Sequence, residues 1–367
     1  MQIKSQPWIH SWYGDSLGFF AIPLVAIFLA VFRLPPFRYI DAAHIGALIT
    51  CVLIIDWAHI FAQWHRIYSN PLETSGKWIY PLSYFLLFPV VGLIFYLGYL
   101  APVESFLVYF VIYHFIKQHY GFIRIYSKID GAKTKFESVT ESALIYLCMW
   151  TPVLYWHSEF PKKDFYWLIH FIKSPLVKNL FWPALVAYIF CFLAYALAEF
   201  KRTKRNGIFN WPKNLALLSA AAGWGLVSVF GEFPVLIFFT VVLTHDVSYI
   251  VFVWLIGRRD HKICKNQVSW FSFWSIPGFL FFCFSALLLS QIIWAIYIET
   301  TMDQNRSYFI VGTIFNDLPS FKEGYMLNLC TSLFYATQAH HYFIDKYLWK
   351  KEKDLAYMVS TGKYHEQ

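Results

Sequence analysis

The residues best suited to chemistry in this sequence are histidines inside or at the end of apolar segments. The chain has thirteen histidines, and seven of them fall at four such places, three of which also carry an aspartate. Neutral imidazole is a good ligand for iron, zinc, copper and nickel. Because ionisable groups in apolar segments are costly, we expect these seven to face a protein interior or a cavity and to bind a metal ion. They are His59, His65, His114, His119, His245, His340 and His341.

Three aspartates accompany these histidines and are the candidate catalytic carboxylates. Asp56 precedes His59 by three positions, and Asp345 follows His341 by four. Both spacings put the carboxylate and the imidazole on one face of a helix. We expect the carboxylates to bind the metal directly or to orient a histidine by a hydrogen bond. The three are Asp56, Asp246 and Asp345.

Two spacings leave alternatives open. His114 and His119 are five apart, so a helix end or local unwinding is needed to bring their rings together. Arg66, Lys117 and Arg124 are most simply basic residues that extend to a membrane interface, and they could instead hold an anionic headgroup. The other histidines are interpreted as loop, interface or packing residues: His10, His44, His157, His170, His261 and His365.

The composition indicates what must position these residues. Hydrophobic residues make up 58% of the chain and charged residues only 14%, against about a quarter in soluble proteins. The apolar residues come in blocks whose length approaches the ~20 residues that cross a bilayer. We therefore predict an all-α, polytopic integral membrane bundle with about eight to ten transmembrane helices. The blocks span 17–32, 42–61, 81–100, 103–126, 139–156, 177–200, 215–230, 233–256, 274–298 and 325–342.

Charges between the blocks predict the orientation. The basic segments Lys201–Arg205, Arg258–Lys262 and Lys346–Lys353 are expected in cytoplasmic loops and tail, and the acidic stretch Glu299–Glu323 outside. This gives a cytoplasmic segment 1–16, one membrane domain 17–345 and a cytoplasmic basic tail 346–367. The protein is expected in the bacterial inner (plasma) membrane, with both termini in the cytoplasm. The seven histidines then lie toward the cytoplasmic face.

Several classes of function are not indicated. The net charge of +8 is explained by membrane orientation, so no nucleic-acid partner is expected. The six cysteines form no CxxC pair and are expected to be packing residues. There is no GxSxG elbow, Walker-type phosphate loop, GxGxxG, HExxH or CxxCH motif.

The histidine pattern resembles that of histidine-rich membrane enzymes with non-haem iron: fatty-acid desaturases, hydroxylases and bacterial β-carotene oxygenases of the Brp/Blh type. The resemblance rests on the seven histidines. His114 and His119 fit the HxxxxH spacing of desaturases, whereas His340 and His341 lack the upstream histidine of an HxxHH box. The resemblance implies an iron centre, molecular oxygen as co-substrate and a lipophilic substrate.

The function expected from these observations is that of a membrane-embedded, metal-dependent oxygenase or oxidase. It would hold a mono- or di-iron site and act on a fatty acyl, isoprenoid or carotenoid chain. Membrane lipids and an electron-donor protein on the cytoplasmic side are the other expected partners. Two alternatives remain open, a haem-binding membrane electron carrier and a transporter of a metal or small solute.

Overall fold

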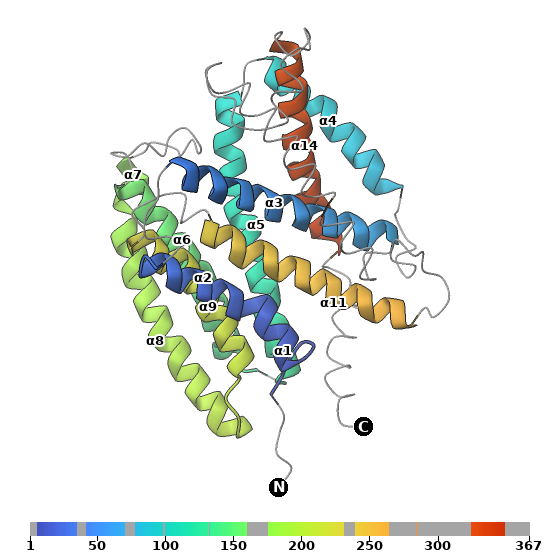
Figure 1. Cartoon of the computed structure of the whole chain (residues 1–367). Coiled ribbons are helices and arrows are strands. Elements are labelled where there is room, and N and C mark those ends of the chain that lie inside the picture. Colours follow the sequence, from blue (N-terminus) through green and yellow to red (C-terminus); the bar gives the residue numbers. More distant parts are fainter. Residues whose placement is uncertain are drawn as a thin grey trace. The chain divides into compact units, whose positions relative to one another are not determined.

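The structure, a computed structural model of the chain, is helical in every described element (Figure 1). No strand occurs among the described residues, which confirms the all-α prediction. Helix predominates because a long apolar segment can pair its backbone N–H and C=O groups within itself only as a helix. The described residues are 6–34, 42–69, 78–97, 100–131, 133–159, 175–230, 239–263, 284 and 324–348.

Contacts divide the chain into two compact units. The first unit comprises residues 1–45, 103–248 and 351–367, and the second comprises 46–102 and 249–350. The chain thus passes between units inside α3 (Ala42–Ser69), near the start of α5 (Leu100–Ile129) and at the start of α11 (Ser248–Ile263).

The first unit is built around α6 (Lys135–Glu159). This helix packs against α8 (Phe181–Asn206) and α9 (Trp211–Phe230), and the short α7 (Pro175–Asn179) adjoins it (Figure 1). Two N-terminal elements pack on α9, the π-helix η1 (Ser16–Ala21) and α2 (Ile22–Val31), and α1 (Trp12–Asp15) contacts η1.

The second unit contains α3, α4 (Ile79–Tyr96), α11 and α14 (Gly324–Leu348). Helices α4 and α14 lie side by side (Figure 1), with Val91 packed against Ala336. Between α3 and α11 the small Ala62 packs against Tyr249 and Val253. The small side chain lets the two helices approach closely.

Local signals explain where individual helices begin and end. Before α6, the Thr134 hydroxyl accepts from the Glu137 backbone N–H, and the Glu137 carboxylate accepts from the Thr134 N–H. This reciprocal capping box fixes the first turn. Helix α8 ends where Gly207 adopts φ 74° and its N–H donates to the Thr203 carbonyl at 2.8 Å. A glycine tolerates that left-handed turn without steric cost.

A proline accounts for the first π-helix. Pro23 lies at the start of α2 and has no N–H to donate, and its ring would crowd the carbonyl four residues earlier, in η1. The wider π turn at Ser16–Ala21 accommodates this conflict.

The apolar blocks correspond well to helices, but the basic segments do not form loops. Lys201–Arg205 lies within α8, and Arg258–Lys262 lies within α11, so the loop assignment of both was wrong. Lys and Arg are good helix formers, and cations near a helix C-terminus favour the helix dipole. The ninth block (274–298, apart from Phe284), the acidic stretch Glu299–Glu323 and the tail from Trp349 onward lie outside the described residues.

Two described helical segments are long and apolar enough to cross a membrane, Trp12–Val31 and Phe181–Asn206. The apolar segments Ile79–Ile94 and Phe239–Leu255 are shorter. The number of spans and the topology therefore stay predictions.

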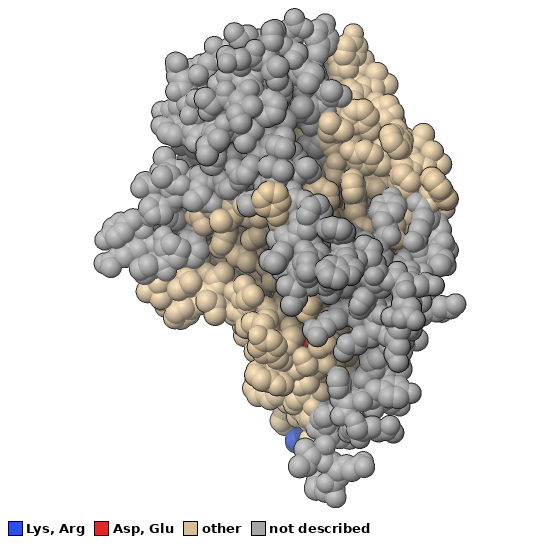
Figure 2. All heavy atoms as spheres, turned by 45° about the vertical axis from the view of Figure 1, so that its right-hand side comes forward, with Lys and Arg blue, Asp and Glu red and all other residues tan. Residues whose placement is uncertain are grey.

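Exposed apolar side chains form a stripe on α8 and another on α4. On α8, Trp182 and Phe190 are each 68% exposed, and on α4 Phe85 is 71% exposed. The stripes repeat at three or four positions, as one face of a helix does. Figure 2 shows a face on which the described residues carry almost no charged side chains. The remaining members are Val186, Ile189, Leu193 and Leu197 on α8, and Ile79, Leu82, Leu86, Val90 and Leu93 on α4.

A buried ion network holds together one end of the first unit. Lys213, fully buried on α9, forms ion pairs with Glu199 of α8 and with Glu141 of α6, the latter at 3.3 Å. Burial lowers the pKa of Lys213, and the two carboxylates oppose that shift. Arg202 in turn pairs with Glu199 and with Asp130. Cations and carboxylates alternate, so each buried charge lies beside an opposite one.

We predict that Lys213→Ala destabilises the protein strongly, because it leaves Glu141 and Glu199 buried with less compensating charge. A broken buried ion pair costs about 3–5 kcal/mol. The measurement is the free energy of unfolding of the full chain in detergent. Lys201→Ala, at an exposed site on α8, is the matched control and should change stability by less than about 0.5 kcal/mol. Equal effects of the two substitutions would contradict the proposed role of the network.

Candidate functional site

The residues expected to form a site lie on helices of both units. In the second unit, α3 carries Asp56 and His59, and α14 carries His340, His341 and Asp345. The side chain of His65, on α3, lies outside the described residues. The members in the first unit are His114 and His119 on α5, and His245 and Asp246 on the π-helix η4 (Leu243–Val247).

In the second unit, polar side chains of α3 meet those of α14 at three successive levels, which we call the α3–α14 ladder. On both helices the levels are separated by three and then four positions, one face of a helix. The levels follow one another in the same order along both helices. Gln338 Nε2 donates to Asp56 Oδ2 at 2.8 Å, His59 Nε2 lies 2.9 Å from His341 Nε2, and Gln63 Nε2 donates to Asp345 Oδ1 at 2.6 Å.

The amide of Gln63 determines which nitrogen of His341 carries the proton. Its Nε2 donates to Asp345 and to the main-chain oxygen of His341 at 3.0 Å, so its Oε1 is the atom that lies 3.0 Å from His341 Nδ1. An amide oxygen only accepts, so His341 Nδ1 is protonated. The lone pair of His341 Nε2 therefore points at His59, whose Nε2–H donates to it.

The carboxylate of Asp345 is fixed beside this histidine pair. Its Oδ1 accepts hydrogen bonds from Tyr249 at 2.8 Å and from Gln63 at 2.6 Å. Its Oδ2 lies 3.7 Å from His341 Nε2. The central side chains are buried, with His341 and Gln63 at 0% and His59 at 1% exposure. The low-dielectric surroundings strengthen each of these hydrogen bonds.

This arrangement contains the donor set of a metal site. His341 Nε2 has a second imidazole nitrogen, His59 Nε2, and a carboxylate oxygen, Asp345 Oδ2, as neighbours, and two ligands bound about 2 Å from one ion lie roughly 3 Å apart. The observed separations of 2.9 and 3.7 Å are close to that spacing. Loss of the proton between His59 and His341 would direct both Nε2 lone pairs at the ion, while Gln63 keeps His341 oriented, as ligand histidines require. Histidine and aspartate side chains among the described residues form groups that could hold a metal ion.

His340 faces a different helix from His341. Its Nε2 lies 2.7 Å from the Tyr80 carbonyl and 3.1 Å from the Ser83 hydroxyl, both on α4. The rings of Tyr84 and Trp64 are its aromatic neighbours, at 5.3 and 6.2 Å between centroids. Because Nε2 donates to a carbonyl, the structure places this histidine in the contact between α14 and α4 and does not bring it to the ladder.

In the first unit, three histidines and an aspartate form a second group, the α5–η4 cluster. The His245 ring lies between those of His114 and His119, with centroid distances of 5.0 and 6.4 Å. His245 Nε2 is 3.7 Å from Asp246 Oδ1, and both side chains are fully buried. The ring of Phe115 stacks on His245 at 3.9 Å. Imidazoles and a carboxylate are again the groups that suit a first-row transition metal.

A hydrogen bond links the π-helix to α5. Gln118 Nε2 donates to the His245 carbonyl at 2.7 Å, and this carbonyl also accepts from the Ser248 backbone N–H. Helix α5 is continuous through His114 and His119, so the unwinding expected between them is absent from α5. The irregular turn lies instead in the segment that carries His245. Such π turns often occur at functional sites.

Of the histidines outside the candidate site, two are described. His10 is exposed, and its Nδ1 contacts Ser11 Oγ at 3.0 Å. His157 is half-buried and hydrogen-bonds the Tyr109 hydroxyl at 2.8 Å, with the two rings stacked. The other side chains in that set lie outside the described residues, namely His44, His170, His261 and His365.

No family model, curated protein or solved structure matches this chain significantly. The function is therefore inferred from the geometry of the residues in this chain.

Sequence reasoning missed the uncharged members of these groups. Gln63 follows His59 by four positions and Gln338 precedes His341 by three, the same spacing that had singled out Asp345 and Asp56. A search for all polar residues on the histidine face of each helix would have found both. Tyr249 gave no such signal, because a tyrosine in an apolar segment is usually a packing or interface residue.

We predict that His341→Ala abolishes metal binding by the α3–α14 ladder, since it removes the nitrogen that faces both His59 and Asp345. Gln63→Leu, which removes the acceptor for His341 Nδ1–H, should weaken metal affinity roughly 10–100-fold. Elemental analysis of the purified full chain, with and without chelator, measures both effects. His157→Ala, a half-buried histidine outside the ladder, is the control. Equal metal content in the His341→Ala and His157→Ala proteins would exclude the ladder as a metal site.

Proposed function

We propose that this protein is a membrane-embedded oxygenase with non-haem iron that acts on a lipophilic substrate. The observation that carries the proposal is the buried pair His59 and His341 beside Asp345. Two histidines and one carboxylate with open positions are the ligand set typical of non-haem iron oxygenases. Burial of ionisable groups costs free energy in so apolar a chain, and such groups inside membrane helices usually have a function.

The membrane part of the proposal is supported by the exposed stripes on α8 and α4. Exposed apolar patches this long are rare on soluble proteins and are typical of surfaces that meet lipid. The proposal places several further helices in the bilayer, in the bacterial inner (plasma) membrane with both termini in the cytoplasm. The two candidate spans and the low charge of the chain support it.

Each residue of the ladder has a separate task in this proposal. His59 and His341 bind iron through Nε2, and Asp345 binds through the oxygen nearest His341. Gln63 holds the His341 ring, and Tyr249 holds the carboxylate. The packing of Ala62, Tyr249 and Val253 beside them keeps water away. Bound iron would supply the redox chemistry with molecular oxygen.

The α5–η4 cluster offers a second ligand group, which keeps the di-iron alternative within the proposal. His114, His119 and His245 provide imidazoles, and Asp246 provides a carboxylate. Asp56, hydrogen-bonded to Gln338 and 3.6 Å from His59 Nδ1, orients His59.

The substrate class follows from the surroundings. A centre within apolar helices is reached most readily by a chain that is itself dissolved in the membrane, such as a fatty acyl, isoprenoid or carotenoid chain. Oxygen dissolves better in lipid than in water, so it reaches such a centre without a channel. The electrons would come from a donor protein at the cytoplasmic surface.

We expect the purified full chain to contain iron and to lack the sharp visible absorption of haem. Haem held between two histidines would need their nitrogens roughly 4 Å apart, twice a metal–nitrogen bond of about 2 Å, whereas His59 and His341 are 2.9 Å apart. Elemental analysis and one visible spectrum separate the two cofactors. A haem spectrum would contradict this proposal and indicate a haem-binding electron carrier.

We also expect the lipid and isoprenoid extract of aerobic cells that express the protein to contain an oxygen-dependent product. That product should disappear with His341→Ala and persist with His157→Ala. An unchanged extract combined with iron-free protein that moves metal ions across liposomes would favour a transporter.

The topology is tested by cysteine labelling. A cysteine placed at Asn206, at the basic end of α8, should react with an impermeant probe only after the membrane is opened. Reaction from the outside of intact cells would reverse the proposed orientation.

A further inference from the structure

A basic pocket lies where the end of α5 meets the start of α6, in the first unit and outside the histidine groups. Its volume is about 380 Å³. None of its lining residues is acidic, and the side chains that line it include four cations and two serine hydroxyls. They are Arg124, Lys128, Lys133, Lys135, Ser127 and Ser138.

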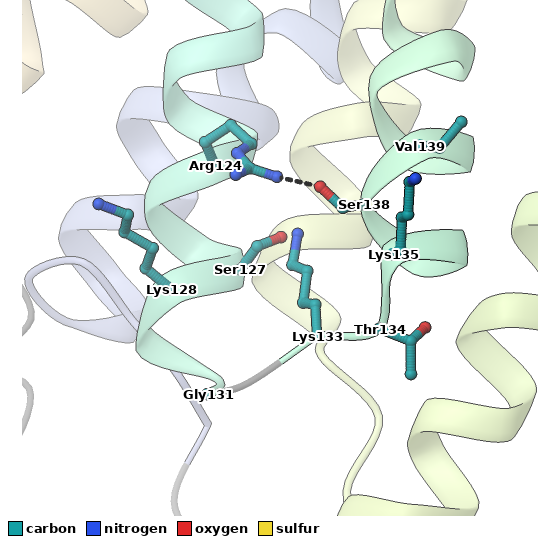
Figure 3. A pocket seen from close by; sticks show the side chains of 9 residues that line it. All are labelled: Arg124, Ser127, Lys128, Gly131, Lys133, Thr134, Lys135, Ser138 and Val139. Carbon is teal, nitrogen blue, oxygen red and sulfur yellow. Dashed lines mark hydrogen bonds between the residues drawn. The ribbon is translucent and has the colours of Figure 1, made fainter.

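Figure 3 shows how these side chains are arranged. Arg124 of α5 and Ser138 of α6 point toward one another, and Arg124 Nη1 donates to the Ser138 hydroxyl at 2.8 Å. The Ser127 hydroxyl and the Lys133 amino group lie in the space between the two helices (Figure 3). Ser127 donates to Glu141 at 2.7 Å, so this wall is anchored to the buried ion network.

Each nearby carboxylate pairs with a cation outside the pocket, and Glu141 also neutralises Lys133 within it. Glu141 pairs with Lys213 as well as with Lys133. Glu137 pairs with Arg205 at 2.9 Å. Asp130 pairs with Arg202, which is also outside the pocket.

The charges that remain are those of Arg124, Lys128 and Lys135. Among the described residues, Lys128 and Lys135 have no ion-pair partner, and both are exposed. Burial lowers the pKa of Lys133, and Glu141 opposes that shift. The N-terminal turn of α6 adds the positive end of a helix dipole beside Lys135.

We propose that this pocket binds a phosphate group. A planar guanidinium, flexible ammonium groups and hydroxyl donors around one hollow are the combination that recognises phosphate oxygens. The volume holds a phosphate with a small substituent. This site is independent of the proposed oxygenase centre, whose residues it does not share.

Two sources share this chemistry, a lipid headgroup and a small soluble phosphate. Phe136 and Val139, the latter in the pocket wall, are 47% and 55% exposed. They offer an apolar surface on which acyl chains can lie when the headgroup is in the pocket. Basic groups at the cytoplasmic ends of helices attract anionic lipids in general.

The test compares two probes on the full chain in detergent. Inorganic phosphate is titrated by calorimetry, and retention of added phosphatidic acid is measured by native mass spectrometry with phosphatidylcholine as reference. Arg124→Gln/Lys135→Gln removes two pocket charges. Lys201→Gln/Lys204→Gln removes two charges from the exposed end of α8 and is the matched control. Thermal unfolding of both variants shows that they remain folded.

We expect the pocket variant to bind at least one probe roughly tenfold to thirtyfold more weakly than the unmodified chain, and the control to bind as the unmodified chain does. Loss for phosphatidic acid alone identifies a lipid headgroup, and loss for inorganic phosphate identifies a soluble phosphate source. If the unmodified chain binds neither probe, or if both double variants lose binding equally, the pocket is not a phosphate site.

Discussion

The structure depends on one constraint: a polar side chain that leaves water must find its partners within the protein. A buried amide or hydroxyl without a hydrogen bond costs several kcal/mol in apolar surroundings, and a lone charge costs more. This chain meets the constraint in two ways. At one end of the first unit, charges alternate through Lys213, Glu199 and Arg202. In the second unit, hydrogen-bond donors and acceptors are matched level by level between α3 and α14.

The ladder shows how structural and chemical requirements coincide. Gln63 satisfies Asp345 and, with the same amide, fixes the proton of His341 on Nδ1. The nitrogen that faces His59 is thereby the one with a lone pair. The hydrogen bonds that make burial of the ladder possible also hold His341 in the tautomer whose Nε2 lone pair can bind a metal ion. A hydrophobic replacement would pack as well, so the polar arrangement is better explained by function than by stability alone.

Apolar and polar side chains occupy different surfaces of the helices. On α8 and α4, large apolar side chains are exposed, while the histidines of the ladder and of the α5–η4 cluster are buried. Exposed apolar side chains suit a helix in lipid, because its backbone is satisfied internally and only its side chains meet the surroundings. The charged network and the basic pocket lie at helix ends.

The sequence by itself determined the all-α class, most helix positions and the residue types of the candidate site. Long apolar blocks leave the backbone no partner except itself, and helical spacing placed Asp56 with His59 and Asp345 with His341. Only the tertiary structure decided which residues meet. It turned His340 toward Tyr80, placed His245 between His114 and His119 through a π turn, and added Gln63, Gln338 and Tyr249. Local spacing fixes the face of one helix, but the partner depends on how separate helices pack, and that is decided by contacts distant in sequence.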